Sequence, residues 1–404
     1  MSVERGSVWL AVNAGSSSLK LALFAAGSFA LVARIQVERI GLAGCHLLAD
    51  DSPMMTVAAD DHRAAFTVAL SFWYRQSVLI SPSALVGIVH RVVHGGERFT
   101  EPTRLTPAVR AEIDRLIPLA PLHNPLALQC IDAATVFAPD TLQVAVFDTA
   151  FHHHMPPEAF HYALPLRFYH EFGIRRYGFH GISVDSVSQQ LADALRQPRD
   201  SLNLIVAHLG NGASMTAIRD GRSVDTTMGF TPLEGLVMGT RAGDLDPAIP
   251  AFLEAHTGMS GADVAHLLNH DSGLKGLCGQ SDLRAIHEAM AGTSPSSSDQ
   301  ARLALAIYVY RIRKYLGAFC GLLGRVDALI FTGGVGEHDA IVRAQALESM
   351  AAFGWHLDPA RNAAALGPNG IVAIHAEGSV PGIYVVPSRE AEQMVRLAAQ
   401  SVVI

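Results

Sequence analysis

The chain has 404 residues, of which 50% are hydrophobic and 17% are charged, and its formal net charge is −7 at pH 7. This length and apolar content suffice for two domains with cores of their own and exclude a small disulfide-stapled scaffold. The negative charge argues against a nucleic acid or an anionic membrane as the main partner. We therefore expect a small-molecule partner, no nucleic acid and no membrane.

The cysteines and the N-terminus indicate the compartment. The four cysteines lie far apart without C-x-x-C spacing, so the sequence signals neither a zinc site nor a disulfide framework. The first residues, MSVERGSVWLAV, carry charges and run directly into a predicted strand, unlike a signal peptide. No apolar run reaches the roughly 18 residues of a membrane span. These features predict a cytoplasmic protein.

The first part of the chain alternates predicted strands and helices. Apolar patterning predicts strands over 7–24 and about 28–36, a helix from Asp60, a buried strand in SALVGIVHRVVHGG, helices around 106–117 and 124–136, and a strand in LQVAVFDTAF. The last of these apolar runs stops at Asp148. This order of elements is typical of an α/β domain.

Near residue 151 the pattern starts again. A helix in VSQQLADALRQ, a strand in LNLIVAHLG and hairpin strands through Val224 are followed by helices from about Asp246 to Ala291. The Ser-rich AGTSPSSSD is expected to be a surface loop, and a long helix from about Gln300 to Leu323 follows it. A strand with a glycine-rich turn is predicted in VDALIFTGGVGEH. A further strand in GIYVVP and a last helix in SREAEQMVRLAAQ follow it.

Two segments, one in each half, share a pattern. LAVNAGSSSLKLALF and IVAHLGNGASMTAI both read as a strand, a Gly/Ser turn and a second strand. The repetition predicts a duplicated unit whose two loops face each other across a cleft, and two chance hairpins are the alternative. We expect one domain at 1–150 plus 386–404 and the other at 151–385.

Three glycine-rich turns are candidates for phosphate binding, because such turns offer converging N–H donors. They lie at Asn13 to Lys20, Gly210 to Ser214 and Phe331 to His338. No lysine directly follows a glycine, which excludes a P-loop, and the dinucleotide fingerprint and the nucleophile elbow each lack a glycine. A lone turn of this kind is more often an ordinary hairpin, but three of them predict one bound nucleotide.

Charged residues at the ends of apolar runs suggest a catalytic centre. Asp148 and Glu390 suit Mg²⁺ held largely through water, with a turn residue and a helix cap as the alternative roles. Arg91 and Arg241 suit phosphate or carboxylate, and a structural ion pair with Asp244 or Glu97 is the alternative. His123 and His180 could equally be core histidines, and His152 to His154 are expected at the surface or an edge.

Ten motifs occur in order along the chain: VNAGSSSLKLALF, VHRVVHGG, PLHNP, VFDTAFHHHMP, YGFHGIS, AHLGNGAS, VDTTMGFTPLEGLVMGTRAGDLDPAI, SDLR, FTGGVGE and VVPSREAE. With them the chain resembles the acetate kinase family along essentially its full length. The resemblance implies an α/β fold with two duplicated domains of the actin-like, ribonuclease H-like type, mixed sheets and an interdomain nucleotide cleft. It also implies a homodimer.

The resemblance further implies roles for individual residues. Asn13, Asp148 and Glu390 would organise Mg²⁺, with Mn²⁺ as an alternative. The catalytic residues would be Asp148, Arg91, Arg241, His180, His123 and Asn211. The residues contacting ATP or ADP would be Lys20, His208, Gly210, Gly212, Asp282, Leu283, Arg284, Gly334, Val335, Gly336 and His338. Arg91 would bind the carboxylate of the substrate, and its methyl group would lie against Val93, Leu122, Phe179 and Pro232.

The resemblance therefore predicts reversible transfer of a phosphoryl group from ATP to acetate, giving acetyl phosphate and ADP. A carboxylic acid is already ionised at pH 7, so the reaction needs cationic shielding and no general base. Val93 leaves less room than the Ala of propionate-preferring relatives and favours acetate. The alternatives are a propionate or other short-chain acyl kinase, a sugar or glycerol kinase, an actin- or Hsp70-like ATPase, and a binding protein.

Four positions depart from the family pattern. Ile182 and Val184 replace a Thr and a His close to His180, His338 stands where many members have Asn, and Ala391 replaces an acid. We expect these changes to affect nucleotide preference and turnover without removing a catalytic residue.

Overall fold

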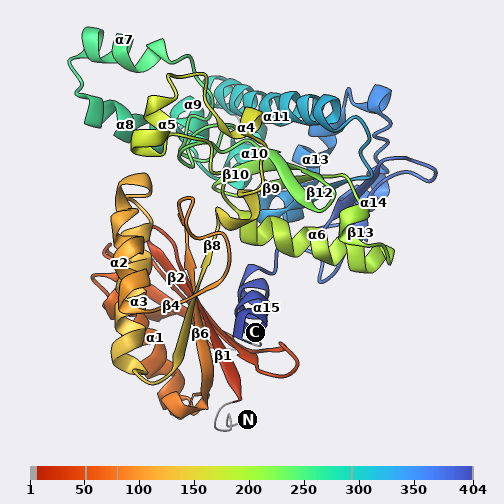
Figure 1. Cartoon of the computed structure of the whole chain (residues 1–404). Helices are drawn as coiled ribbons and strands as arrows, with labels where there is room; N and C mark the ends of the chain where they lie inside the picture. Colours follow the sequence, from red (N-terminus) through yellow and green to blue (C-terminus); the bar gives the residue numbers. More distant parts are fainter. Residues whose placement is uncertain (1–6, 51, 80, 293, 403–404) are drawn as a thin grey trace. The chain divides into compact units, whose positions relative to one another are not determined.

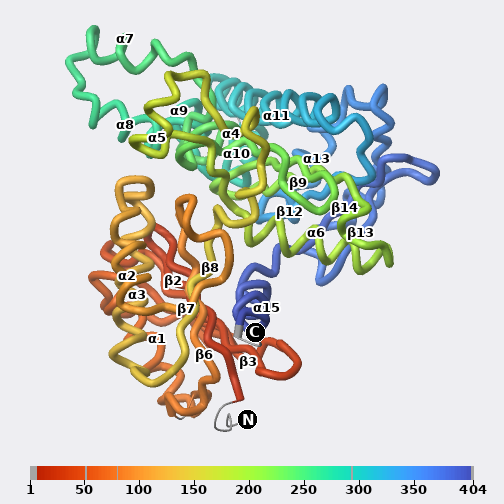
Figure 2. The backbone as a smooth tube through the Cα atoms, in the orientation of Figure 1, coloured from red at the N-terminus to blue at the C-terminus, as the bar shows by residue number. Residues whose placement is uncertain are grey.

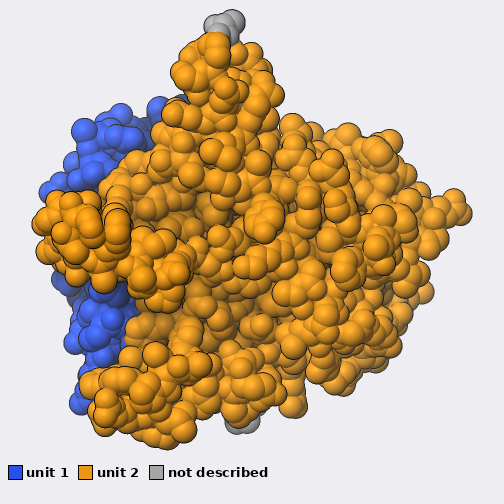
Figure 3. All heavy atoms as spheres, turned by 90° about the horizontal axis from the view of Figure 1, so that it is seen from above, with its two compact units in different colours: residues 1–150, 389–404 blue, residues 151–388 orange. Residues whose placement is uncertain are grey.

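The computed structural model describes residues 7–50, 52–79, 81–292 and 294–402. The chain divides into two compact units (Figure 3): unit 1 comprises the described residues of 1–150 and 389–404, and unit 2 comprises those of 151–388. The second boundary lies three residues later than the sequence indicated. The reason is that Val386 N donates to Phe331 O at 3.0 Å and the Gln190 side chain donates to Pro387 O at 3.0 Å, which fastens this segment to unit 2.

Unit 1 is built on a mixed sheet. Its strands run in the spatial order β5 (Met55–Thr56), β4 (His46–Ala49), β3 (Leu31–Glu38), β2 (Ser18–Ala25), β1 (Val8–Ala14), β6 (Leu85–Val92), β8 (Leu142–Phe147) and β7 (Thr103–Arg104). β1, β6 and β8 are parallel, whereas β2 and β3 pair antiparallel with their neighbours. The carboxyl ends of the three parallel strands therefore share one edge of the sheet.

Helices cover both faces of this sheet. α1 (His62–Arg75) and α3 (Asn124–Phe137) pack on one face, with α2 (Pro107–Arg115) against α3, and α15 (Glu390–Val402) packs on the other (Figure 1). Figure 2 shows this last helix beside β1, so the two ends of the chain belong to one unit.

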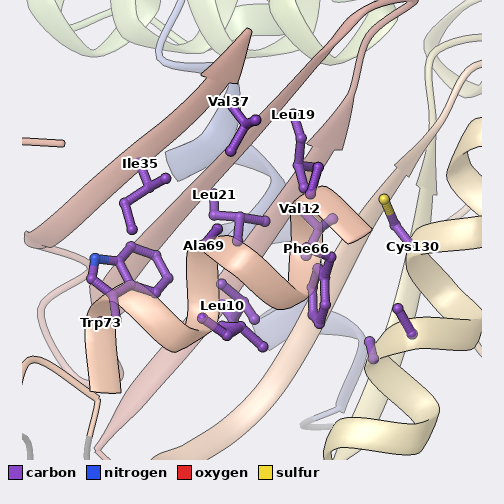
Figure 4. Close-up of a cluster of buried hydrophobic side chains, with 14 of the residues drawn as sticks. Leu10, Val12, Leu19, Leu21, Ile35, Val37, Phe66, Ala69, Trp73 and Cys130 are labelled. Carbon is purple, nitrogen blue, oxygen red and sulfur yellow. The ribbon is translucent and has the colours of Figure 1, made fainter. Parts of the chain in front are cut away.

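The core of unit 1 follows from the alternation of side chains along its strands. Leu10 and Val12 of β1 point toward Phe66 and Trp73 of α1 (Figure 4), and all four are at most 3% exposed. The helix begins where Asp61 accepts a hydrogen bond from Ala64 N at 2.7 Å, as an N-cap residue does. The strands and helices expected in this part of the sequence are therefore present.

Unit 2 is also built on a mixed sheet. Its strands run in the order β11 (Arg222–Thr226), β10 (Ala213–Arg219), β9 (Leu204–Leu209), β12 (Ala328–Thr332), β14 (Gly382–Val385) and β13 (Val372–Ala373). β9, β12 and β14 are parallel, and β10 and β11 continue antiparallel from β9.

The two sheets share one topology. In each, an antiparallel three-strand meander (β1–β2–β3 or β9–β10–β11) leads into two strands parallel to its first strand (β6 and β8, or β12 and β14). The similar segments noted in the sequence form the first hairpin of each meander. This agreement confirms the duplicated α/β architecture and excludes two chance hairpins.

The helices of unit 2 are α4 (Pro157–Phe160), α5 (Arg167–Phe172), α6 (Gly181–Leu195), α7 (Ala248–Thr257), α8 (Gly261–His270), α9 (Gly273–Cys278), α10 (Leu283–Ala291), α11 (Pro295–Leu323), α12 (Gly333–His338), α13 (Ala340–Leu347) and α14 (Pro359–Ala364). Val184, Val187 and Leu191 of α6 pack against Leu204 and Val206 of β9. Short 3₁₀ turns in the described part of the chain span Pro82–Ala84, Ile117–Leu119, Ala150–His152, Arg199–Ser201 and Ala351–Phe353. Within the described residues, no helix combines the length and hydrophobicity that crossing a bilayer requires.

Two expectations about unit 2 are wrong. Most of AGTSPSSSD is not a loop, because α11 begins at Pro295, a residue whose fixed φ and missing N–H suit the first helical position. His152 is not a surface residue: it is 0% exposed, and its ring nitrogens contact Ser223 Oγ and Phe179 O, each at 2.9 Å.

Candidate active site

Unit 1 brings Arg91, Asp148 and Asn13 together at the carboxyl edge of its parallel strands. Arg91 is the last residue but one of β6, Asp148 directly follows β8, and Asn13 lies near the end of β1. Arg91 Nε donates to Asp148 Oδ1 at 3.0 Å and to Oδ2 at 3.1 Å, and Nη2 donates to Oδ2 at 2.5 Å. Arg91 Nη1 donates to Asn13 Oδ1 at 3.1 Å. Ligands in open α/β sheets bind at such an edge.

The electrostatics of this cluster follow from burial. Burial raises the pKa of the Asp148 carboxyl, Arg91 opposes that shift, and the negative charge of Glu390 adds to it. Burial also acts to lower the pKa of Arg91, but the carboxylates of Asp148 and Glu390 outweigh it and the pKa is raised. The sequence had left Asp244 or Glu97 as the partner of a structural arginine. Asp244 instead contacts Arg311 Nη1 at 2.9 Å and Tyr315 Oη at 2.8 Å.

The donor chemistry of unit 1 fits a magnesium ion. Asn13 Oδ1 and the Asp148 carboxylate contact the same arginine, and the Glu390 carboxylate, at the start of α15, acts on both charged members of that pair. Oxygen donors from one or two carboxylates, completed by water, are what Mg²⁺ takes. Among the described residues no cluster of three or more His, Cys, Asp or Glu could cage a metal.

The Gly/Ser turn after β1 is tightly closed. Gly15 N donates to Ser18 O at 2.8 Å, and Gly15 O contacts His62 Nε2 at 2.7 Å. A Cβ on Gly15 would lie 2.7 Å from Ser18 Oγ, so only glycine fits without a shift. Lys20, expected to contact nucleotide, is exposed on β2 opposite Asn13. The turn thus holds Asn13 beside Arg91.

The other residues expected from unit 1 lie near the same strands. Val93 follows β6 and is 5% exposed, whereas Leu122, before α3, is 44% exposed. His123 directly precedes α3 and is half-buried. The residues expected to contact the acyl group thus belong to both units, with Phe179 and Pro232 in unit 2.

Unit 2 brings His180 and Arg241 together at Gly212. A Cβ on Gly212 would lie 3.5 Å from His180 Nε2 and 3.6 Å from Arg241 Nη1. Arg241 Nη1 also donates to Pro232 O at 3.2 Å. His180 has φ 59°, a left-handed conformation that is uncommon outside glycine and often marks a functional site.

A second histidine supports His180. The rings of His180 and His208 stack with centroids 4.2 Å apart. His180 Nδ1 contacts Ser214 Oγ at 2.9 Å, and His208 Nδ1 contacts Ser183 Oγ at 2.8 Å. These serines fix the orientation of both rings.

A pocket of about 800 Å³ lies in unit 2. Eight of the residues expected at the nucleotide or phosphate line it: Gly210, Asn211, Asp282, Leu283, Arg284, Gly334, Val335 and His338. His208, Gly212 and Gly336 belong to the same strand ends and turns but are outside its lining, and Lys20 belongs to unit 1. Its size suits a nucleotide-sized ligand.

Sequence reasoning missed the rest of this lining: Gly239, Leu274, Ser281, His287, Tyr308, Asp339, Ala340, Ile341 and Leu366. Ser281 lies inside the SDLR motif, and Gly239 lies inside the long motif that begins at Val224. A Cβ there would be 2.2 Å from Asn211 Oδ1, so this glycine makes room for the Asn211 side chain. The remaining residues of this set lie in helices and loops where no short sequence pattern indicates a contact with a ligand.

The pocket combines apolar walls with a few polar groups. His287 Nε2 contacts Asp339 Oδ2 at 2.8 Å, and the pKa of the Tyr308 hydroxyl is raised by burial and by the Asp339 charge. Arg284 Nε donates to Asp282 Oδ1 at 3.0 Å at the start of α10. Apolar walls with few polar groups suit a planar base attached to a charged chain.

The departures from the family pattern lie at three different places. Ile182 and Val184 lie in α6 and are 3% and 0% exposed, so they pack in the core. His338 lines the pocket, and its Nδ1 contacts Gly334 O at 3.0 Å. Ala391 is half-buried in α15.

Comparison with known proteins gives the family. Residues 8–396 match the model of the acetokinase family. The chain belongs to this family. The acetate kinase of Syntrophobacter fumaroxidans is 43% identical over 402 residues, covering 97% of this chain and 96% of that protein. The acetate kinase of Streptomyces avermitilis is 46% identical over 387 residues, covering 94% of each.

Solved structures of acetokinase-family proteins agree. The acetate kinase of Porphyromonas gingivalis matches with a TM-score of 0.89 at 37% identity, covering 99% of this chain and 100% of that one. The propionate kinase of Francisella tularensis matches with a TM-score of 0.89 at 35% identity, covering 97% and 98%. The resemblance drawn from the motifs is confirmed, and so are the fold class and the expected kind of enzyme, a phosphotransferase with a carboxylate acceptor.

Proposed function

We propose that this protein is an acetate kinase that transfers the γ-phosphoryl group of ATP to acetate, reversibly, giving acetyl phosphate and ADP. Membership in the acetokinase family and the acetate kinases among its relatives support this function. Unit 2 supplies the nucleotide pocket in this proposal, and unit 1 supplies the groups for the carboxylate and the metal.

The observation that carries the proposal is the state of Asp148. Three hydrogen bonds from Arg91 engage both of its oxygens, and the carboxylate is 2% exposed. A kinase for an alcohol needs a base that takes the hydroxyl proton. The Asp148 carboxylate, with both oxygens hydrogen-bonded to Arg91, is poorly placed to accept a hydroxyl proton. A carboxylic acid substrate is already ionised at pH 7, so its phosphorylation needs no base. The geometry therefore favours a carboxylate acceptor over a sugar or glycerol.

The cationic groups would reduce the electrostatic repulsion between the acetate carboxylate and the phosphates of ATP, which is the main barrier to this reaction. Arg91 would bind the substrate carboxylate through its guanidinium. Arg241 Nη1 and His180 Nε2, which meet at Gly212, would stabilise the charge on the transferring phosphoryl group. His208 orients His180 by stacking, and Asn211 would contact the phosphates from the pocket wall.

Asn13, Asp148 and Glu390 would hold Mg²⁺, with Mn²⁺ as a substitute. The ion would neutralise charge on the phosphate oxygens of ATP. Lys20, exposed opposite Asn13, would reach the phosphates from the Gly/Ser turn.

Propionate is the second candidate substrate. The similar Francisella tularensis protein is named a propionate kinase. Val93 is 5% exposed and branched at Cβ, which favours the smaller acetate. A methylene changes discrimination by about 1 to 3 kcal/mol, so propionate should react more slowly but measurably.

A cytoplasmic homodimer is part of the proposal. The four cysteines are free thiols, which suits a reducing compartment. Ile249 and Phe252 of α7 are 41% and 61% exposed, and these apolar side chains are candidate contacts with a second copy. Light scattering should give twice the chain mass, and Phe252→Asp should shift the mass toward the monomer. A monomer at all concentrations would contradict the dimer.

Hydroxylamine trapping tests the function. Purified protein is incubated with ATP, Mg²⁺ and hydroxylamine in separate tubes with acetate, propionate, butyrate or glycerol. The proposal predicts abundant acetyl hydroxamate, less propionyl hydroxamate, and none after chelation with EDTA. ADP release that is equal with glycerol, with acetate and without acceptor, and without any hydroxamate, would favour an ATPase instead.

A further inference from the structure

Arg343 of α13 is a buried cation that donates its hydrogen bonds to neutral oxygens, with the negative charge of Asp339 acting on it as well. Its side chain is 0% exposed. Nε donates to Asn362 Oδ1 at 2.8 Å, Nη1 to Gly336 O at 2.8 Å, and Nη2 to Asn362 O at 2.9 Å and Ala365 O at 2.7 Å. Burial lowers the pKa of Arg343 to about 10, although the Asp339 carboxylate opposes that shift, so the group stays charged at pH 7.

The acceptors of Arg343 stand behind the wall of the nucleotide pocket. Gly336 lies in α12 between Val335 and His338, both of which line the pocket, and Ala365 directly precedes the lining residue Leu366. The connection to this wall therefore runs through the backbone carbonyls of Gly336 and Ala365, which directly adjoin the lining residues Val335 and Leu366 in the chain.

Asn362 extends the same set of contacts. While its Oδ1 accepts from Arg343, its Nδ2 donates to Ala340 O at 2.8 Å, and Ala340 lines the pocket. Asn362 is 4% exposed in α14. Arg343 and Asn362, here called the clamp, thus connect α12, the start of α13 and the segment after α14.

A further contact shows that this wall is closely fitted. Gly367 N donates to Glu337 O at 2.9 Å, and a Cβ on Gly367 would lie 2.4 Å from His338 Nε2. The imidazole of His338 therefore fills the space beside Gly367. A shift of α12 against the segment after α14 would move His338 and Leu366, two lining residues, relative to each other.

We propose that the clamp of Arg343 and Asn362 positions the pocket wall and so sets the affinity for the nucleotide, without touching the nucleotide itself. The proposal rests on the proposed function only in taking the ligand of this pocket to be ATP or ADP. The two residues are positioning residues, and the alternative is that they serve the stability of unit 2 alone.

The test compares three variants of the full chain. Arg343→Lys keeps the charge but cannot make all four hydrogen bonds, and Asn362→Ala removes the acceptor of Nε and the donor to Ala340. Arg313→Lys is the control, because Arg313 of α11 likewise donates to a backbone carbonyl on α13, that of Gln345, and neither residue lines the pocket. For each protein we would measure ADP affinity by calorimetry, KM for ATP and for acetate, kcat and the urea midpoint of unfolding.

Arg343→Lys and Asn362→Ala should each weaken ADP binding and raise KM for ATP about tenfold, a typical effect of losing a residue that orients a binding group. KM for acetate and kcat at saturating ATP should change less than about twofold. Arg313→Lys should lower the urea midpoint while leaving ADP affinity unchanged. The double clamp variant should be little worse than either single one, since both residues act through one connection.

Clamp variants that lose stability but bind ADP as tightly as the natural protein would overturn the proposal. If Arg343→Lys does not fold, Asn362→Ala decides. Failure of the proposed function can be told apart from failure of the clamp proposal. If the natural protein binds ADP but forms no acyl phosphate, and the clamp variants bind ADP more weakly, the proposed function is wrong and the clamp proposal is supported.

Discussion

Arg91 and Asp148, which are 57 residues apart in sequence, form a bidentate ion pair between neighbouring parallel strands, with Nε to Oδ1 at 3.0 Å and Nη2 to Oδ2 at 2.5 Å. The same arginine reaches Asn13 Oδ1 at 3.1 Å. One side chain therefore connects the ends of three strands and presents a cation at their shared edge. This relationship makes Arg91 important for both the reaction and the stability of unit 1.

Arg91→Ala should lower kcat/KM for acetate by about a hundred- to a thousand-fold, the usual effect of removing a group that stabilises transition-state charge. It should also lower the free energy of unfolding by about 3 kcal/mol, because the buried Asp148 loses its partner. Activity measured well below the unfolding temperature, together with urea unfolding, separates the two effects.

The double variant Arg91→Ala, Asp148→Asn is the matched control, since the neutral amide leaves no unpaired buried charge. It should recover part of the stability but none of the activity. Near-normal acetyl phosphate formation by a folded Arg91→Ala protein would refute the role given to this arginine.

Gly239→Ala should raise KM for ATP at least several-fold, because its Cβ would lie 2.2 Å from Asn211 Oδ1 and displace that side chain from the pocket wall. Gly317→Ala is the control: it lies within α11, with nothing within 4 Å of the added Cβ. That change should leave kinetics unaltered and stabilise the helix by up to about 1 kcal/mol. Steady-state kinetics of both variants test the expectation, and unchanged KM for ATP in Gly239→Ala would count against it.

Val93→Ala should shift specificity toward propionate. The smaller side chain frees room for one methylene, so the ratio of kcat/KM for propionate to that for acetate should rise about tenfold. The ratio is measured with both acids in the hydroxamate assay, and Val86→Ala, at an exposed position of β6, is the control. An unchanged ratio would mean that Val93 does not contact the acyl group.

Acid should destabilise the protein between pH 6.5 and pH 4. Burial lowers the pKa of His90 and of His152 to about 4. The unfolded chain, with histidine pKa values near 6.5, binds protons in this range that the folded chain does not. The stabilising contribution is therefore complete above pH 6.5 and is lost as the pH falls toward 4, by at most about 1.4 kcal/mol per pH unit for each histidine.

Urea unfolding at pH 7.5 and 5.5 measures this effect. Trp9 and Trp73 report on unit 1, where His90 contacts Gln143 Oε1 at 2.9 Å. His90→Gln should lose less stability over that pH interval than the natural protein. Equal losses in the two proteins would show that His90 does not contribute.

Much of the fold could be predicted from local pattern. In the hairpins β1–β2 and β9–β10, apolar-rich strands stand on both sides of a Gly/Ser turn, so the relationship between the two hairpins is visible in the sequence. His152 shows the limit of this approach: an HHH run has no period that indicates burial, which depends on Ser223 and Phe179, distant along the chain.

The site could be predicted only where a motif carries it. Gly210, Asn211 and Gly334 lie in recognisable turns and do line the pocket. Tyr308 and Leu366 line it as well, but they reach it through the packing of α11 and the segment after α14, which no short pattern encodes. The partner of Arg91 was missed for the same reason, because strand adjacency and not sequence distance brings Asp148 to it.

The most direct test of the account is phosphorus NMR of the reaction with ¹⁸O-labelled acetate, ATP and Mg²⁺. If a carboxylate oxygen of acetate forms the new bond to the transferred phosphorus, acetyl phosphate should appear with ¹⁸O bonded to phosphorus, seen as an isotope shift of its resonance, in step with formation of ADP. Formation of ADP and unlabelled inorganic phosphate, with no acetyl phosphate signal, would contradict the account.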